Sequence, residues 1–185
     1  RSLLDDFPVD QLYTSVPRRF REITPVVECK AGQQWEWDGV RFAMLGPLTA
    51  GTKENDNSCV LRVSGQGGSV LLTGDIEAAA ERQLLERDGA SLRSDILIVP
   101  HHGSKTSSSE AFVEQVGPRW ALIPAGYLNR FGFPHPSVME RYRTHEVATL
   151  STGQAGAIVM EVNPDTGVSV PILWRQEYQR YWTVR

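Results

Sequence analysis

The stretch SVLLTGDIEAAAERQLLERDGASLRSDILIVPHHGSKTSSS, residues 69–109, decides the fold. It contains two short apolar runs, Val70–Thr73 and Ile96–Val99, and each predicts a buried strand because turn residues bound it. Between them, Glu77–Arg87 has an apolar stripe at four-residue spacing and is followed by Gly89, which predicts a helix with a glycine cap. A strand, a helix and a second strand in this order imply a right-handed parallel crossover.

Residues that can bind a metal follow both predicted strands. Asp75 comes just after the first strand, and His101 and His102 come after the second. Because ligand sites in open α/β sheets lie beyond the carboxyl ends of the strands, we expect these side chains at one edge of the sheet. Carboxylate and imidazole donors suit Zn²⁺, Mn²⁺ or iron.

The roles within this cluster follow from geometry and charge. We predict Asp75 and His102 as catalytic metal ligands, with Asp75 holding two cations close together. The alternative, in which Asp75 only caps the following helix, stays open. Consecutive residues on an extended backbone point in opposite directions, so at most one of the two histidines faces the cleft as a ligand. We favour His102 and keep His101 as the alternative metal ligand.

Further polar residues near this edge are candidates for substrate binding: Asn57, Ser58, Ser104, Lys105, Thr106, Asn129, Arg130 and His135. Those that precede the predicted helix 110–116 offer hydroxyls, one ammonium and free N–H groups to a phosphate, although helix capping alone would also explain them. Ser107 and Glu110 have the spacing of a capping box.

The remaining candidates depend on the neighbouring loops. His135 follows the next predicted strand, 120–123, and can therefore reach the same edge. Asn57 and Ser58 either contribute polar groups at the rim or form an Asx-rich turn. His145 lies at an exposed helix end and is expected to be inert.

The composition is that of an ordinary globular domain. The chain has 185 residues, 41% apolar and 22% charged, and lacks a run of 18 apolar residues that would predict a membrane span. A net charge of −3 argues against non-specific nucleic-acid binding by bulk charge, but leaves room for a local basic patch. Cys29 and Cys59 favour two buried thiols, with a disulfide as the alternative in an oxidising compartment; a CxxC metal site is excluded.

The two halves of the chain have different strand patterns. The first half predicts an antiparallel meander, with Asp38-Gly39 as a hairpin turn, and the second half alternates strands and helices. The expected strands are 26–30, 34–37, 40–45, 59–63, 120–123, 147–150, 157–162 and 168–174, and the later helices are 110–116 and 138–144.

Taken together, these motifs resemble a known family. They are Glu54–Ser58, Leu72–Asp75, Pro100–Ser104, Thr106–Ser109, Asn129–Gly132 and Thr152–Ile158. In this order they are similar to the metallo-β-lactamase-like domain at the C-terminus of ComEC, the bacterial competence protein that forms the inner-membrane channel for DNA uptake. The resemblance implies an α/β fold, an αββα sandwich with a dinuclear metal site at its edge.

One hallmark of the wider family, the HxHxDH motif, does not occur in this sequence. The resemblance therefore implies that residues 1–185 are one N-terminally truncated metallo-β-lactamase-like domain, made of the central meander and the C-terminal half. The family's bridging aspartate falls on Asp75, and its late histidine ligand falls on the His101–His102 pair. Gly132–Pro136 reads Gly-Phe-Pro-His-Pro, where relatives often have two histidines.

The resemblance also implies a function. The complete domain would bind two divalent ions, Zn or Mn, and act as a nuclease that degrades the DNA strand that is not transported. This chain alone is expected to be soluble, to be inactive because it has too few ligands, and to hold either fewer ions or none. Its expected partners are DNA, the transmembrane channel part of the parent, and a second copy through an exposed apolar surface. The parent would lie in the inner membrane, with this domain on the periplasmic or extracellular side.

Two alternative functions stay open at the level of the sequence. One is a non-catalytic module that binds DNA or docks on the channel, favoured by the alternating aromatic and arginine residues of 174–182. The other is a hydrolase of another phosphoester or a lactone, because a scaffold does not decide its substrate.

Overall fold

The computed structural model describes residue 4 and residues 6–20, 25–48 and 53–179. A seven-stranded sheet in the order β3-β4-β5-β6-β7-β8-β9 forms its centre. The strands are β3 (Gln34–Trp37), β4 (Val40–Gly46), β5 (Val60–Gly65), β6 (Gly68–Leu72), β7 (Ile96–Ile98), β8 (Trp120–Ile123) and β9 (Ala148–Ser151).

The sheet changes from antiparallel to parallel at β6. Strands β3 to β6 pair antiparallel, and β6 to β9 pair parallel, as the alternating second half predicts. The hairpin between β3 and β4 turns at Asp38 and Gly39, whose φ angles of 49° and 76° are those that an Asp-Gly turn needs.

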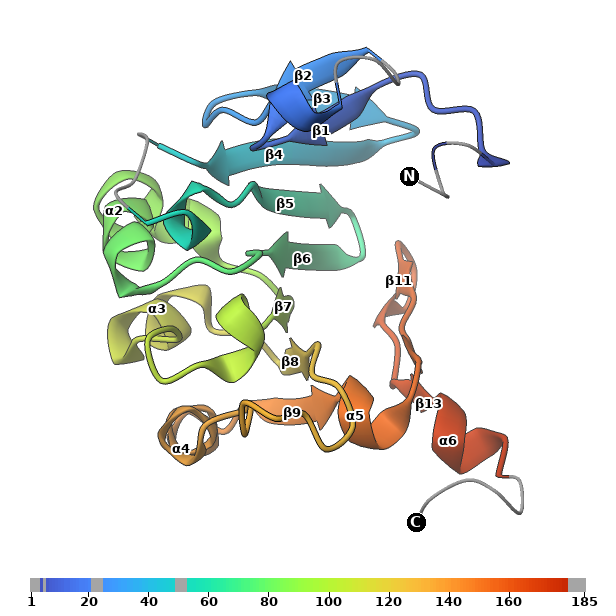
Figure 1. Cartoon of the computed structure of the whole chain (residues 1–185). Coiled ribbons are helices and arrows are strands. Elements are labelled where there is room, and N and C mark those ends of the chain that lie inside the picture. Colours follow the sequence, from blue (N-terminus) through green and yellow to red (C-terminus); the bar gives the residue numbers. More distant parts are fainter. Residues whose placement is uncertain (1–3, 5, 21–24, 49–52, 180–185) are drawn as a thin grey trace.

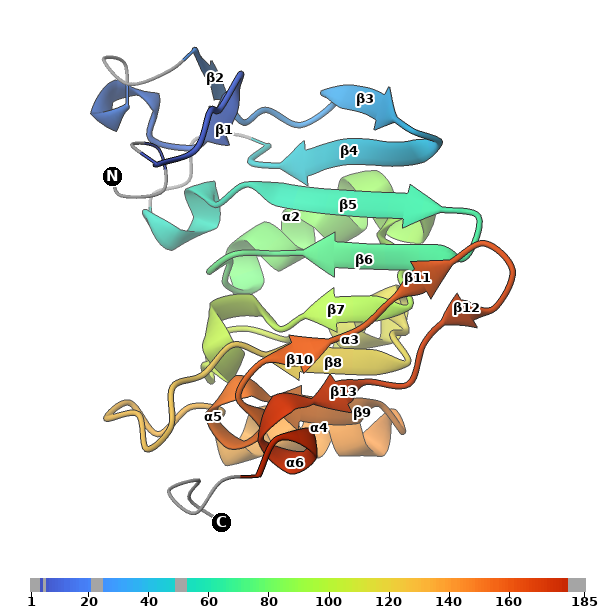
Figure 2. The same cartoon turned by 90° about the vertical axis from the view of Figure 1, so that its right-hand side faces the viewer.

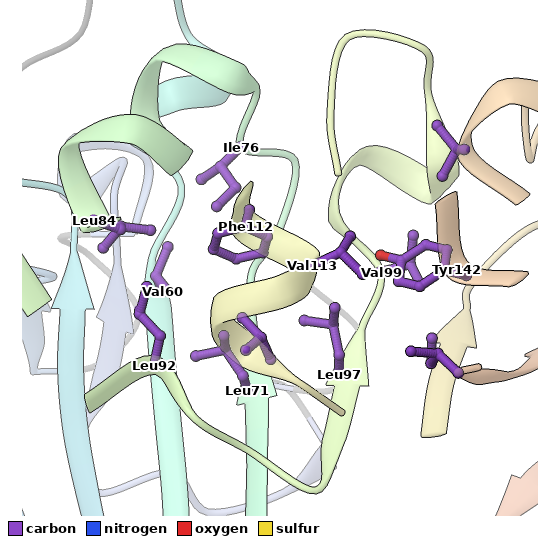
Figure 3. Close-up of a cluster of buried hydrophobic side chains, with 14 of the residues drawn as sticks. Val60, Leu71, Ile76, Leu84, Leu92, Leu97, Val99, Phe112, Val113 and Tyr142 are labelled. Carbon is purple, nitrogen blue, oxygen red and sulfur yellow. The ribbon is translucent and has the colours of Figure 1, made fainter. Parts of the chain in front are cut away.

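Three helices cover one face of the sheet (Figures 1 and 2). They are α2 (Ala78–Asp88), α3 (Glu110–Val116) and α4 (Pro136–Thr144). The core lies between them and the sheet, where Leu71 and Leu97 from the strands meet Leu84, Phe112 and Tyr142 from the helices (Figure 3). All five side chains are buried, so the helical stripes and the inward strand positions meet as their spacing predicts.

A C-terminal arm crosses the opposite face of the sheet (Figure 2). It contains two antiparallel pairs, β10 with β13 and β11 with β12. The bounds are β10 (Ile158–Val159), β11 (Val162–Asn163), β12 (Gly167–Val168) and β13 (Ile172–Leu173). The two longer strands expected here, 157–162 and 168–174, are therefore wrong in extent. Pro171 has no N–H with which to continue a ladder, and the chain turns into helix α6 (Trp174–Glu177) instead.

The remaining elements are short. They are the parallel pair β1 (Leu12–Thr14) and β2 (Val26–Glu28), helix α5 (Thr152–Ala155), and the 3₁₀ turns η1 (Pro17–Arg19), η2 (Asn55–Asn57), η3 (Gly89–Leu92) and η4 (Pro100–Gly103).

Cys29 and Cys59 form a disulfide. The preference for two buried thiols is therefore wrong. The chain after β2 returns beside the start of β5 and brings the two Cα atoms to 5.6 Å, a proximity that 30 residues of intervening sequence do not reveal. The bond ties the β1–β2 pair to the central sheet.

Candidate functional site

Asp75 lies just after β6, and a hydrogen bond to Ser58 holds its backbone. Its N–H donates to Ser58 Oγ over 3.1 Å, and that hydroxyl donates to the carbonyl of Asn55 over 2.7 Å. Gly74 (φ 57°) permits the contact, because a Cβ there would lie 2.8 Å from the Cβ of Ser58. Helix α2 has Glu77 as its N-cap, without a side-chain cap. The Asp75 carboxylate is therefore not used as a helix cap, and its side chain remains 45% exposed.

His102 faces Asp75 across this edge. Its Nε2 lies 3.5 Å from Asp75 Oδ1, and its Nδ1 lies 2.8 Å from the carbonyl oxygen of Pro124. Because a carbonyl oxygen only accepts hydrogen bonds, Nδ1 carries a hydrogen, and Nε2 is the ring nitrogen that faces the carboxylate. A backbone carbonyl behind a metal-binding histidine is the usual way in which its ring is oriented.

The expected extended backbone at the two histidines is wrong. Both lie in the 3₁₀ turn η4 with left-handed φ angles, 47° for His101 and 55° for His102. Such angles are costly for residues with a Cβ and are found where the surrounding structure enforces them. The two rings still diverge: their planes meet at 64°, and only His102 approaches Asp75.

His101 points toward a second acidic residue. Its Nδ1 lies 3.6 Å from Glu77 Oε1 and is buried without a hydrogen-bond partner in the described structure. Glu77 also accepts from the Lys53 ammonium and the Asn55 amide, and Asp56 accepts from its backbone N–H. The hydrogen bond from Lys53 lowers the pKa of Glu77 and keeps it ionised.

The Asp75–His102 pair fits two ligand positions of one metal ion. Two ligands bound to a tetrahedral zinc at about 2.1 Å lie about 3.4 Å apart, close to the observed 3.5 Å. Across the described ranges, however, no group of three or more His, Cys, Asp and Glu side chains is arranged to hold a metal. The pair thus has the spacing of a partial metal site, and its role as metal ligands remains a prediction.

Glu81, which sequence reasoning missed, anchors the loop that carries the histidines. It is fully buried, and its two carboxylate oxygens accept the backbone N–H groups of Ser108 and Ser109 at the start of α3. The predicted Ser107–Glu110 capping box is therefore wrong: α3 has Ser109 as its N-cap and is capped by a carboxylate from α2. Burial raises the pKa of Glu81, although the hydrogen bonds oppose this shift. A charged residue beside the apolar stripe was its only signal in the sequence.

Two residues of α4 complete this support. The Arg141 guanidinium donates to the carbonyls of Ser107 and Ser108, at 3.1 and 2.9 Å. The buried Tyr142 hydroxyl lies 3.0 Å from Ser108 Oγ, and burial raises its pKa. Buried groups that are paired in this way specify one arrangement of a loop.

The hydroxyl residues after η4 mostly bond within their own loop. Ser104 Oγ lies 3.1 Å from Thr106 Oγ1, while Ser107 Oγ donates to the carbonyls of Pro100 and Ser104. Lys105 and Thr106 are exposed beside η4. Their predicted contact with a phosphate remains a prediction.

The other predicted residues hold their own segments in place. His135 caps α4 by accepting from the Ser137 N–H, and its backbone N–H donates to the Gly103 carbonyl. Asn129 bonds both backbone groups of Phe133. The others have these neighbours: the Asn57 amide donates to the Lys53 carbonyl, the Arg130 guanidinium lies over the Phe131 ring, and His145 bonds Glu110.

No family model matches the chain. Among curated proteins, it is 38% identical over 153 residues to competence protein ComA of Neisseria gonorrhoeae, covering 82% of this chain and 22% of the relative. It is 39% identical over 158 residues to recombination protein 2 of Haemophilus influenzae, covering 85% of this chain and 20% of the relative. ComE operon protein 3 of Bacillus subtilis is 34% identical over 134 residues, which are 72% of this chain and 17% of the relative.

Two solved structures match this chain over part of its length. The metallo-β-lactamase fold protein YhfI of Bacillus subtilis matches with a TM-score of 0.47 and 11% identity, over 76% of this chain and 61% of that protein. A zinc-dependent hydrolase of the metallo-β-lactamase superfamily from Thermotoga maritima, assigned as putative, matches with a TM-score of 0.39 and 15% identity, over 67% and 60%. The arrangement of the strands and helices confirms the predicted fold class as mixed α/β with a large central sheet. By sequence, the chain is a homologue of these competence and recombination proteins and spans about one fifth of their length.

Proposed function

We propose that this chain is part of a metal-dependent hydrolase domain in a competence protein, and that the complete domain is a nuclease for the DNA strand that is not transported. The names of the relatives, competence and recombination proteins, support a role in handling DNA. The single observation that carries the hydrolase assignment is the 3.5 Å approach of His102 Nε2 to Asp75 Oδ1.

The residues around this pair do distinct work. Asp75 and His102 would hold the ion, the Pro124 carbonyl keeps the Nε2 lone pair turned toward it, and Ser58 holds the backbone of Asp75. A bound divalent ion would supply a nucleophilic hydroxide at neutral pH and neutralise charge that develops on a phosphodiester. The buried Glu81 keeps the histidine turn in position against α3.

Two ligands leave the site incomplete, since zinc sites use three or four protein ligands. We propose that another part of a longer parent supplies the remaining ligands for two ions. The relatives are about five times longer than the matched segment, which leaves room for it. The isolated chain is then expected to be inactive.

The proposed location rests on the Cys29–Cys59 disulfide. No helix in the part of the chain that the structure describes is long and apolar enough to cross a membrane. The Cys29–Cys59 disulfide favours an oxidising compartment, which supports the periplasmic or extracellular side of a parent anchored in the inner membrane.

Cleavage assays test this proposal. Two proteins are compared: the chain, and a form extended N-terminally by about 60 residues, which is enough to complete a domain of typical size. Each is incubated with Mn²⁺ or Zn²⁺ and with one of four substrates, namely single-stranded DNA, duplex DNA, a small phosphodiester and a lactone. We expect only the extended form to cut DNA. Asp75→Asn should abolish cleavage, whereas Asp38→Asn should not, because Asn-Gly serves equally well in that hairpin turn.

Other outcomes would favour the alternatives. Hydrolysis of the lactone or the small phosphodiester, but not of DNA, would indicate another hydrolase on the same scaffold. DNA binding without cleavage by any form would indicate a non-catalytic module. Metal-dependent cleavage by the unextended chain would contradict the partial site.

A further inference from the structure

A row of aromatic rings leads from the surface to His102. In the segment between β8 and α4, the Phe131 and Phe133 rings stack with centroids 5.7 Å apart and planes 20° apart. The Phe133 ring in turn faces His102 at 6.3 Å and 25°. Phe131 is 65% exposed at the outer end of this row. The row thus presents the face or edge of a ring to solvent within reach of the partial metal site.

The segment that carries the row is firmly held. Asn129 accepts from the Phe133 N–H and donates to the Phe133 carbonyl, at 3.0 and 2.7 Å. The His135 N–H donates to the Gly103 carbonyl over 2.8 Å, which fastens the segment to the histidine turn. A Cβ on Gly103 would lie 2.7 Å from the Cβ of Pro134, so the two loops touch. The rings are therefore placed in advance and need little ordering when a ligand binds.

Two guanidinium groups lie over exposed rings of the same segment. The Arg130 Cζ lies 4.9 Å from the Phe131 centroid, and the Arg175 Cζ from α6 lies 5.7 Å from the Tyr127 centroid. Arg175 is held there because its Nη1 donates to the Gly153 carbonyl. Tyr127 is 49% exposed. Two exposed rings of this segment thus each have a guanidinium neighbour.

A hollow of about 420 Å³ lies along the same segment. Tyr127 and Phe133 contribute to its wall, Met139 gives it an apolar side, and Gln154 and Thr149 add hydrogen-bonding groups. None of the described residues that line it is acidic. A flat, partly polar ring carried on an anionic backbone matches this lining better than a carboxylate or a simple alkyl chain does.

We propose that Tyr127, Arg130, Phe131, Phe133 and Arg175, the ring surface, bind unpaired bases of single-stranded nucleic acid and place the adjoining phosphate at Asp75 and His102. Aromatic side chains and arginine bind successive bases by stacking, with little dependence on base identity. This inference rests on the proposed function. It adds that the substrate is a single strand, and it names the residues that bind that strand. The row of rings ends at His102, which favours a nucleic acid over a lipid surface. Binding to a bilayer surface does not require rings aligned toward His102.

Binding of a fluorescent twelve-nucleotide oligothymidylate to this chain, measured by anisotropy in EDTA, tests the ring surface. The comparison ligand is an abasic oligonucleotide of equal length, which keeps the phosphates and removes the bases. Phe131→Leu retains an apolar side chain without the ring and should weaken binding of the oligothymidylate by about 5- to 100-fold, with little effect on the abasic ligand. Phe131→Trp should restore the affinity.

Trp37→Leu is the matched control, because Trp37 is an equally exposed ring at 69%, at the far end of edge strand β3. It should leave binding unchanged. Equal effects of Phe131→Leu and Trp37→Leu, or equal affinity for the abasic ligand, would overturn the inference. So would Phe131-dependent binding to vesicles of three parts phosphatidylcholine and one part phosphatidylglycerol without binding to the oligonucleotide. Because no metal is present, failure of metal-dependent cleavage leaves this result unaffected.

Discussion

At the scale of single residues, Glu81 connects the packing of the helices to the geometry of the site. It lies on α2 between Ala80 and Leu84, all three of them buried. Its oxygens accept two N–H groups at the start of α3. Those groups would otherwise be unpaired in the interior, at a cost of about 1–3 kcal/mol each. The loop that carries His101 and His102 therefore depends on a carboxylate that touches neither histidine.

Glu81→Gln should lower the free energy of unfolding by about 1–3 kcal/mol, because an amide can accept only one of the two hydrogen bonds without opposing N–H groups. Burial raises the folded-state pKa of Glu81 above the unfolded value of 4.5. The folded wild type therefore binds more protons than the unfolded wild type, and its stability falls as pH rises from 4.5 through that raised pKa. The variant lacks this titration. Its free energy of unfolding should therefore fall furthest below that of the wild type near pH 4.5, and the difference should become smaller at higher pH.

Urea unfolding between pH 4 and 8 measures this difference, with Glu114→Gln on the exposed face of α3 as the control. A deficit of Glu81→Gln that is independent of pH would show that the carboxyl is not perturbed. A deficit no larger than that of Glu114→Gln would show that the buried cap contributes little.

At the scale of elements, the C-terminal arm approaches the central sheet closely at the turn between β5 and β6. The turn between β5 and β6 meets β11 at Gly67, where a Cβ would lie 2.0 Å from the Asn163 carbonyl oxygen. The arm covers part of a sheet face with an apolar row formed in register by Leu61, Leu72, Ile98, Leu122 and Leu150. Leu72 remains 38% exposed beneath this cover.

Gly67→Ala should push the β11–β12 turn away from β6 and destabilise the chain by about 1–3 kcal/mol, as overpacking does. Gly65→Ala is the control, because a Cβ there meets nothing within 4 Å and the φ angle is not in the left-handed region. Limited proteolysis should cleave residues 157–173 faster in Gly67→Ala alone. Identical cleavage and stability of the two variants would show that this contact does not hold the arm.

Sequence patterns predicted the α/β part well because its elements have local signals. Strands β6 to β8 and helices α2 and α3 were predicted within one or two residues by apolar runs, a four-residue stripe and glycine caps. The four two-residue strands of the arm had no such signal, since their pairing is decided by contacts with the sheet. Glu81 and the Cys29–Cys59 disulfide depend in the same way on residues that are distant in sequence.

The sequence likewise predicted one part of the candidate site and missed another. Topology alone brought Asp75 and His102 to one edge, but the left-handed turn at His101 and His102 had no local signal in the sequence. His135 and Asn129 turned out to brace their own loops. The last residues of the 174–182 tail, 180–182, lie outside the described residues.

At the scale of the whole molecule, the sheet is covered by helices on one face and by the narrow arm on the other (Figure 2). The arm on that second face carries exposed apolar side chains, among them Val162, Val170 and Ile172, and the binding of a second copy there remains a prediction. Light scattering at rising concentration should show a dimer. A monomer at all concentrations would contradict this prediction.

In the proposed function, Asp75 and His102 are two ligands of a metal site completed elsewhere in a longer chain. The most direct measurement is the metal content, after equilibrium dialysis, of the chain and of its N-terminally extended form. We predict about two ions in the extended form and fewer or none in the chain. Asp75→Asn and His102→Asn should each lower the metal affinity of the extended form at least tenfold. Asp38→Asn should leave that affinity unchanged. An extended form that binds no metal, or that binds it equally well without Asp75 and His102, would contradict the role of these two residues as metal ligands.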